Sequence, residues 1–257
     1  MEIIVLMKQV PATESFIEIA QDGRSIKTDN LNWVINPYDE IAVEEAIRIK
    51  EAQGGNVTVV TIGQAAAQDA IRTAMAMGVD NGILINDPEA FECDSLGTAK
   101  ILAETIKKMD YDLIIAGQRA VDDDNYVGGP AVAQYLDIPC ITLVTQQTIS
   151  DQKIQCERTI DGGMEVVEAC LPALLTTQRG LNEPRYTSLP GIMKAKKKKI
   201  DTRTLADMDI QSLGEAHSQV LAMELPSKKR KVRLIEGNSP QEKTDLLVKA
   251  LQEAHFI

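Results

Sequence analysis

The chain has 257 residues, a formal charge of −11 and an isoelectric point near 4.8, and it is long enough for one large α/β domain with an extension. This acidic balance argues against a general nucleic-acid-binding protein, because no net positive field would attract a phosphate backbone. Four widely spaced cysteines and two histidines near the C-terminal end argue against a disulfide framework, a zinc site or a catalytic histidine.

Short apolar runs alternate with helical patterns through the first half of the chain. The runs lack polar alternation and therefore suit strands that are buried on both faces, as in a parallel sheet. These predicted strands span residues 2–7, 57–62, 82–85 and 112–116. The predicted helices between them span residues 40–50, 65–77 and 95–108. Short links between alternating strands and helices predict a doubly wound, mostly parallel sheet with right-handed crossovers. Ser95 is the expected N-cap of the third helix.

The pattern changes after a helix that is predicted over residues 130–136. Strand-like segments follow at residues 141–145, 153–158, 165–170 and 171–177. Asp161-Gly162-Gly163 is the expected hairpin turn between two of them, and Asp22-Gly23 predicts a smaller hairpin over residues 17–26. We therefore expect antiparallel additions to close one side of the sheet, in an α/β domain that spans residues 1–200.

Residues 201–257 are expected to form a C-terminal arm. Residues 201–238 are polar and irregular, and a flexible linker is the alternative to an arm that wraps a partner. Ser239-Pro240 then starts a final helix with an apolar face that includes Leu247 and Leu251.

No targeting or membrane signal stands out in the sequence. The chain begins with a strand-like run instead of a signal-peptide pattern, and no apolar segment approaches membrane-spanning length. We therefore expect a cytoplasmic protein that is not membrane-embedded.

The segment from Gly117 to Pro130 is the strongest candidate for ligand chemistry. It follows a predicted strand, contains the three aspartates Asp122–Asp124 and the glycines Gly128 and Gly129, and enters a helix. Glycines before a helix allow backbone amides to approach a phosphate, and the helix N-terminus favours the anion. The segment is neither a P-loop nor a GxGxxG motif, and an ordinary acidic loop is the alternative. A metal site ranks below a nucleotide site, because adjacent carboxylates on a loop rarely point to one centre.

Residues 182–199 are a second candidate site, which we call the docking loop. Pro184 and Pro190 bracket residues that can be neither regular helix nor central strand, and Tyr186 and Leu189 place large apolar groups on this surface segment. Five lysines then follow within six positions. Positive charge would speed the encounter with an acidic partner, and the apolar groups would fix the pose. The alternative is a loop whose leucine packs on its own domain beside a solvated basic turn.

Several stretches together carry a family resemblance. The most specific one contains Asn182-Glu183-Pro184-Arg185-Tyr186, Leu189-Pro190 and Ile192-Met193-Lys194-Ala195-Lys196-Lys197-Lys198. The others are Val5-Leu6-Met7-Lys8-Gln9-Val10, Ile35-Asn36-Pro37-Tyr38, Ile41-Ala42-Val43-Glu44-Glu45-Ala46, Ile71-Arg72-Thr73-Ala74-Met75-Ala76-Met77-Gly78 and Val121-Asp122-Asp123-Asp124. In these stretches, which span most of its length, the chain resembles the β subunit of electron transfer flavoproteins.

This resemblance implies an α/β domain of the adenine-nucleotide-binding, flavodoxin-like type that pairs with an α subunit and helps to enclose its FAD. It also implies AMP in this subunit, and electron transfer between acyl-CoA dehydrogenase-type flavoenzymes and a downstream redox acceptor, with the flavin supplying the redox chemistry. By position, the implied nucleotide contacts are Leu6, Asn36, Pro37, Tyr38, Asp39, Ile62, Gly117, Gln118, Arg119, Ala120, Val121, Asp122, Asp123, Asp124, Asn125, Tyr126, Val127 and Gly128. The implied partner-docking residues are Tyr186, Leu189, Pro190, Ile192, Met193, Lys196, Lys197 and Lys198. The C-terminal arm, residues 201–257, is expected to pack on the α subunit.

One stretch departs from the ordinary members of that family. They follow the aspartates with an Asn-Gln-Thr-Gly-Gln-like run that holds the AMP phosphate, whereas this chain has Tyr126-Val127-Gly128-Gly129-Pro130. That ending is similar to electron-bifurcating members, whose β subunit holds a second FAD and reacts with NADH, although those members usually carry Asp-Gly-Asp in place of Asp122–Asp124. AMP is the preferred interpretation, and a second FAD is the alternative.

Two further functions come from other classes. A stand-alone adenine-nucleotide-binding regulatory module is one, although it would need neither the arm nor the docking loop. An independent hydrolase or transferase is the other, and it would lack a base, a nucleophile and a metal cluster in a suitable arrangement.

Overall fold

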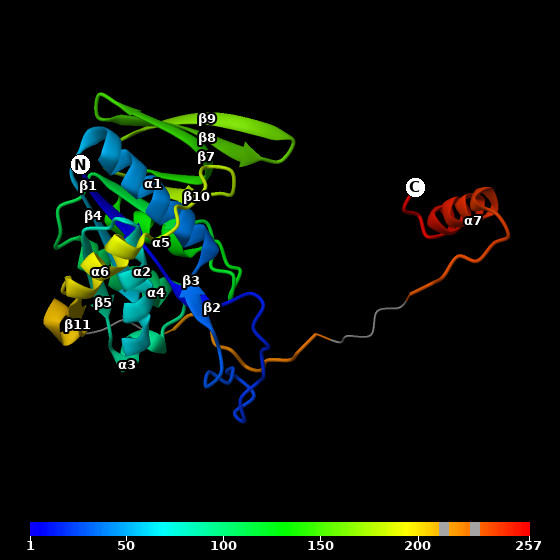
Figure 1. The fold of residues 1–257 in the computed structure, drawn as a ribbon, viewed down its shortest axis with the longest axis horizontal. Helices are drawn as coiled ribbons and strands as arrows, with labels where there is room; N and C mark the ends of the chain where they lie inside the picture. The colour runs from blue at the N-terminus through cyan, green and yellow to red at the C-terminus, as the bar shows by residue number, and fades with distance from the viewer. Residues whose placement is uncertain (211–215, 227–231) are drawn as a thin grey trace.

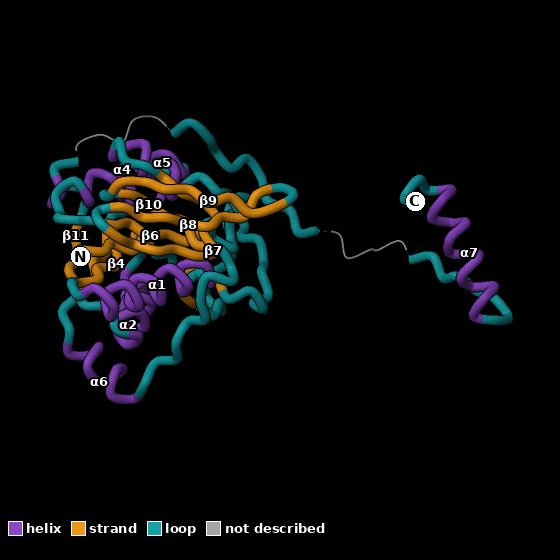
Figure 2. Tube along the Cα trace, turned by 90° about the horizontal axis from the view of Figure 1, so that it is seen from above, coloured by secondary structure: helices purple, strands orange, loops and turns teal. Residues whose placement is uncertain are grey.

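The structure is a computed structural model that describes residues 1–210, 216–226 and 232–257. Over these residues the body is a nine-stranded sheet with helices on both faces (Figures 1 and 2). The strands lie side by side in the order β11, β5, β4, β1, β6, β10, β7, β8, β9. Their bounds are β1 Glu2–Leu6, β4 Asn56–Ile62, β5 Asn81–Ile85, β6 Leu113–Gly117, β7 Cys140–Ser150, β8 Lys153–Ile160, β9 Gly163–Cys170, β10 Ala173–Thr177 and β11 Asp201–Arg203. A separate ladder pairs β2 (Gln9–Pro11) with β3 (Trp33–Ile35).

The helices form a layer on each face of the sheet. Figure 2 shows α4 and α5 on one face and α1 and α2 on the other, with α6 outside them. Their bounds are α1 Pro37–Gln53, α2 Gln68–Met77, α3 Pro88–Phe91, α4 Ser95–Ile106, α5 Gly128–Leu136, α6 Leu189–Lys197 and α7 Pro240–Glu253, with 3₁₀ turns η1 at Ala65–Ala67 and η2 at Ala206–Met208. None of the described helices is both long and apolar enough to cross a membrane.

Strand β1 shows why the apolar runs of the sequence are continuous. Ile3 and Val5 belong to the apolar cluster under α1 and α2, whereas Ile4 and Leu6 belong to the cluster under α4 and α5. Because successive side chains of a strand point to opposite faces, a strand covered on both faces needs apolar residues at every position. The parallel pairing of β1 with β4 and β6 confirms the predicted sheet.

Two local details of the first half differ from the prediction. Helix α4 is capped by Asp94 and not by Ser95, because the Asp94 carboxylate accepts the Gly97 N–H at 2.9 Å. The predicted hairpin over residues 17–26 is limited to one antiparallel bridge between Ile19 and Ile26. The regular antiparallel pairing of this region joins β2 and β3, which come before and after residues 17–26 in the sequence.

In the second half of the chain the predicted antiparallel strands are present, but one predicted strand occupies a different place in the sheet. Strand β8 pairs antiparallel with β7 and with β9 at one side of the sheet. Strand β10, however, lies between β6 and β7 and is parallel to both. All five of its residues are buried, so it is part of the central sheet and not of the antiparallel addition.

The C-terminal region divides into several parts. The body extends beyond the predicted boundary at residue 200, because β11 pairs with β5 as the edge strand of the sheet, and Leu205 and Met208 are buried in the apolar cluster beneath it. Further along, the N–H groups of His217 and Ser218 donate to the Asp94 carboxylate at 2.6 and 3.1 Å. Helix α7 stands apart from the body in both views, and none of the residues described for it is buried (Figures 1 and 2). Within the predicted irregular stretch, residues 211–215 and 227–231 lie outside the described residues.

Candidate functional site

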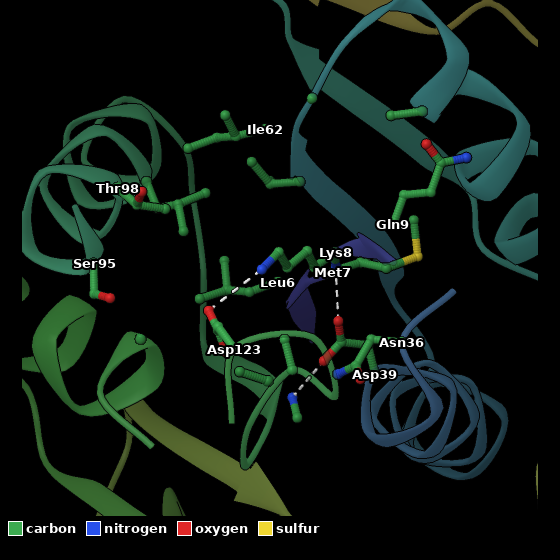
Figure 3. Close-up of a pocket in the computed structure, with 18 of the residues that line it drawn as sticks. Leu6, Met7, Lys8, Gln9, Asn36, Asp39, Ile62, Ser95, Thr98 and Asp123 are labelled. Atoms are coloured by element: carbon green, nitrogen blue, oxygen red, sulfur yellow. Dashed lines mark hydrogen bonds and ion pairs between the residues drawn. The ribbon is translucent and has the colours of Figure 1, made fainter. Parts of the chain in front are cut away.

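A cavity of about 530 Å³ lies at the carboxyl ends of the central strands. Leu6, Ile62 and Gly117 line it from the ends of β1, β4 and β6, and Ser95 and Gly128 line it from the starts of α4 and α5 (Figure 3). This is the edge at which doubly wound sheets bind their ligands, and the volume lies within the usual range of small-molecule sites.

Asn36 connects the start of α1 with the loop that follows β6. Its buried side chain donates from Nδ2 to the Arg119 carbonyl at 2.9 Å and accepts the Val121 N–H on Oδ1 at 3.2 Å. Pro37 occupies the first turn of α1, where a missing N–H leaves no helix bond unmade. The amide of Asn36 therefore fixes the backbone of this loop at the edge of the cavity.

Asp39 joins the ends of β1 and β6. Its carboxylate accepts the Lys8 N–H at 2.7 Å and the Gly117 N–H at 3.0 Å. Burial raises the pKa of Asp39 from 3.8 to about 7, against the opposing effect of hydrogen bonds from Lys8, Asn36 and Gly117. A Cβ at position 117 would collide with Asp39 Oδ1 and lie 2.8 Å from the Tyr38 Cβ, so the approach requires glycine.

Lys8 faces two of the three consecutive aspartates. Its Nζ lies 2.8 Å from Asp122 and 3.3 Å from Asp123, and Figure 3 shows it directed toward Asp123. Burial lowers the pKa of Lys8, but the two carboxylates outweigh that effect and raise it overall, so the ammonium stays charged at neutral pH. These aspartates thus pair with a lysine. No group of three or more His, Cys, Asp or Glu side chains in the described part of the chain is placed to hold a metal ion.

Arg119 gathers the remaining charged and aromatic groups beside the cavity. It pairs with the third aspartate, Asp124, and donates to the Tyr38 hydroxyl at 3.0 Å. Its guanidinium carbon lies 5.1 Å from the ring centre of Tyr38 and 5.7 Å from that of Tyr126, distances typical of cation–π contacts. Burial opposes ionisation of the Tyr38 hydroxyl, but the hydrogen bond from Arg119 lowers the pKa of Tyr38 overall. Tyr126 is about half exposed, whereas Tyr38 is buried.

The irregular segment predicted between Pro184 and Pro190 ends one residue early, because helix α6 already begins at Leu189. Leu189 is the first residue of α6, because the Ser188 hydroxyl caps the helix by accepting the Gly191 N–H at 3.2 Å. Pro190 fits because the first turn of a helix does not use its N–H. Between the two prolines, residues 185–188 are irregular as predicted, and Leu189 is the exception. The apolar residues of this region with exposed side chains are Tyr186, Leu189, Ile192 and Met193.

The lysines of the docking loop do not all have the same surroundings. Lys196 and Lys197 are exposed at the end of α6. Lys198 instead donates from Nζ to the carbonyls of Val79 and Asp80 at 2.7 and 3.0 Å, and burial lowers its pKa. Lys198 therefore attaches the end of α6 to the body.

Residues 24–208 match the family model of the electron transfer flavoprotein domain. Over 259 residues the chain is 40% identical to the electron transfer flavoprotein subunit beta of Bacillus subtilis (strain 168), with all of both chains covered. The chain belongs to the electron transfer flavoprotein β-subunit family. The relative from Thermoanaerobacterium thermosaccharolyticum is 37% identical over 262 residues, again with both chains covered in full. The human relative is 41% identical over 214 residues, which cover 82% of this chain and 84% of the human one.

The family-derived nucleotide contacts fall into two groups in the structure. Those that line the cavity are Leu6, Asn36, Asp39, Ile62, Gly117, Gln118, Arg119, Ala120, Asp123, Asn125 and Gly128. Those outside its lining are Pro37, Tyr38, Val121, Asp122, Asp124, Tyr126 and Val127. The second group includes Tyr126 and Val127, which are part of the departure from ordinary members of the family.

One wall of the cavity, provided by α3, α4 and the link between them, was not predicted from the sequence. Phe91, Cys93, Ser95 and Thr98 line it, and the Ser95 hydroxyl accepts a hydrogen bond from Asn125 Nδ2 at 2.8 Å. The available signal was their position after a parallel strand, since the segments that follow such strands meet at one edge of the sheet.

Proposed function

We propose that this chain binds AMP in the cavity and, together with an α subunit, helps to enclose an FAD. The heterodimer would then carry electrons in the cytoplasm between acyl-CoA dehydrogenase-type flavoenzymes and a downstream redox acceptor. The observation that carries this proposal is the cavity itself. The chain belongs to this family, and its cavity lies at the edge where doubly wound sheets bind their ligands. Hydrogen bonds of Asn36 and Asp39 fix the loop beside the cavity.

The polar groups of the cavity suit an adenine nucleotide. Gln118 is buried and lines the cavity, and its Oε1 has no hydrogen-bond partner among the described residues. A buried acceptor without a partner costs free energy, which a ribose hydroxyl or an adenine amino group would recover by donating to it. Gly128 and Gly129 form the start of α5, where backbone N–H groups and the helix dipole favour a phosphate.

The flavin supplies the redox chemistry when it is bound. The residues described here would contribute binding, orientation and electrostatics. The relatives are named as β subunits, which supports pairing of this chain with an α subunit. Family membership also favours this function over a stand-alone regulatory module.

Identification of the nucleotides released from the purified heterodimer tests the proposal. We expect one FAD and one AMP per heterodimer. Two flavins per heterodimer would replace AMP by a second FAD and favour an electron-bifurcating member. A native protein that purifies as a flavin-free monomer or homodimer would instead favour the stand-alone nucleotide-binding module.

A further inference from the structure

One arginine attaches the docking loop to helix α1. The Arg185 guanidinium donates from Nε to Glu44 at 2.8 Å, from Nη1 to Glu51 at 2.6 Å, and from Nη2 to Glu44 at 3.2 Å and to Glu51 at 3.0 Å. The Arg185 backbone N–H also donates to Glu44, at 3.2 Å. We call these three residues the Arg185 cluster. The Glu44 side chain is only 3% exposed, whereas that of Glu51 is 55% exposed.

The residues just beyond the Arg185 cluster make a sharp contrast with it. Tyr186 is fully exposed and Leu189 is 73% exposed. At the far end of this short span, α6 packs against α2, where a Cβ on Gly191 would lie 2.5 Å from the Ala76 carbonyl oxygen. Residues 186–189 thus extend between two attachments, one on α1 and one on α2.

A second contact strengthens the attachment on α1. The Asn182 side chain donates from Nδ2 to the Ile41 carbonyl at 3.0 Å and to Glu45 at 2.8 Å. The Arg185 cluster then determines the direction of the chain three residues later, because a planar guanidinium that bonds two carboxylates at once has few alternative orientations.

The charge state of the Arg185 cluster is suited to this role at neutral pH. Burial by itself raises the pKa of Glu44, but hydrogen bonds from Arg185 and Arg48 lower it overall. The hydrogen bonds from Arg185 also lower the pKa of Glu51. Both carboxylates are therefore ionised when the loop is attached, and each hydrogen bond in the cluster is charge-assisted.

We propose that Arg185 is a positioning residue for partner docking. Through Glu44 and Glu51 it sets the pose in which Tyr186 and Leu189 meet the surface of an acyl-CoA dehydrogenase-type flavoenzyme. The inference rests on the docking role that the family resemblance implies for this loop. A loop that is already ordered before the encounter loses less conformational entropy on binding, and its apparent affinity is not reduced by the fraction of misplaced loops.

The test uses the flavin-loaded heterodimer and a purified acyl-CoA dehydrogenase that reduces it. Arg185→Lys keeps the charge but removes the planar fork, and Glu51→Gln removes the exposed carboxylate without leaving a buried charge unpaired. We expect each variant to raise the KM for the heterodimer by about five- to tenfold, with kcat and the melting temperature close to those of the wild type. In the double variant the two effects should not multiply, because both act through the same contact.

A matched control and an independent readout separate positioning from general damage. Arg158→Gln removes an arginine whose side chain is similarly exposed, at 28% against 33% for Arg185, and whose partner Glu165 lies on β9. This control should leave the KM unchanged. Reduction of the bound flavin by a small-molecule reductant should be the same in all variants, since it requires no docking.

Leu189→Ala distinguishes failure of this inference from failure of the docking function. We expect it to raise the KM at least tenfold, because loss of a leucine anchor at an interface costs that much in affinity. If Leu189→Ala raises the KM while Arg185→Lys and Glu51→Gln do not, Arg185 has no positioning role and docking stands. If all three leave the KM unchanged, both proposals are wrong. Lower melting temperatures for Arg185→Lys and Glu51→Gln with an unchanged KM would show a merely structural role.

Discussion

Gly117 and Gly128 lie at opposite ends of one loop and have opposite surroundings. An added Cβ at Gly117 would meet Asp39 and Tyr38, whereas one at Gly128 would meet no atom within 4 Å. We expect Gly117→Ala to lower the free energy of unfolding by about 1–3 kcal/mol, the usual cost of overpacking. Chemical denaturation measures this, with Gly163→Ala as the control, because position 163 also has open space. Equal stability of the two variants would contradict the close approach at Gly117.

Gly128→Ala is expected to act on the ligand and not on the fold. Gly128 lines the cavity at the start of α5, and the added methyl group would occupy open space there. We expect unchanged unfolding but about tenfold weaker AMP binding, which corresponds to a clash of about 1.4 kcal/mol. Titration of AMP into the nucleotide-depleted heterodimer provides the measurement. Unaltered affinity would place the nucleotide away from the start of α5.

Asp39 makes stability depend on pH in a predictable direction. Its pKa is raised from 3.8 to about 7 in the folded protein, so the folded state binds this proton more tightly than the unfolded chain does. The contribution of Asp39 to the free energy of unfolding is therefore fully present below pH 4 and is lost as the pH rises to about 7. Asparagine does not titrate, so the stability of the wild type relative to Asp39→Asn should fall between pH 4 and 7 and then stay level. Urea unfolding at a series of pH values measures this difference. A constant difference over that range would show that Asp39 keeps an ordinary pKa.

Two kinds of lysine lie within three residues at the C-terminal end of helix α6. Lys196 and Lys197 are exposed, whereas Lys198 donates to the carbonyls of Val79 and Asp80. We expect the double variant Lys196→Gln, Lys197→Gln to slow association with the dehydrogenase several-fold at low salt. The effect should vanish at high salt, because steering is screened beyond a Debye length of about 10 Å at 0.1 M.

Lys198→Gln is the contrasting variant for the same helix. It removes the two hydrogen bonds by which the Lys198 ammonium helps to attach the end of α6 to the body, so we expect the free energy of unfolding to fall by about 1–2 kcal/mol. Stopped-flow association at several salt concentrations, together with thermal melting, separates the two roles. A loss of stability in the double variant, or of salt-dependent association in Lys198→Gln, would reverse the assignment.

The molecule as a whole has a compact body and a C-terminal helix that covers none of it. Because β11, Leu205 and Met208 belong to the body, a truncation after Lys199 would damage the fold, whereas one after Pro226 removes α7 alone with its connection. We expect the chain truncated after Pro226 to keep its melting temperature but to copurify poorly with a coexpressed α subunit. The reason for this expectation is the exposed apolar face of α7, which includes Leu246 and Leu247. A normal yield of heterodimer would show that α7 does not pack on the α subunit.

Much of the fold could be predicted because local patterns specify it. Continuous apolar runs identified β1, β4 and β6, and Ser239-Pro240 marked the start of α7. The parallel topology brings the ends of β1, β4 and β6 to one edge of the sheet, where the cavity lies, and part of the 117–128 loop lines it. In each case the relevant interaction is either within a few residues or shared by all sheets of this type.

The remaining features depend on contacts between residues that are far apart in sequence. Strand β10 lies between β6 and β7, although the chain reaches it only after β7, β8 and β9, and the body extends past residue 200 because β11 pairs with β5. Lys198 has the same local sequence character as Lys197, yet only the carbonyls of Val79 and Asp80 make it an attachment. Asp39 and Gly117 are likewise complementary only where the ends of two strands meet. Local sequence carries the propensity of each segment, but hydrogen-bond partners and burial arise when the segments pack together, and these decide what each side chain does.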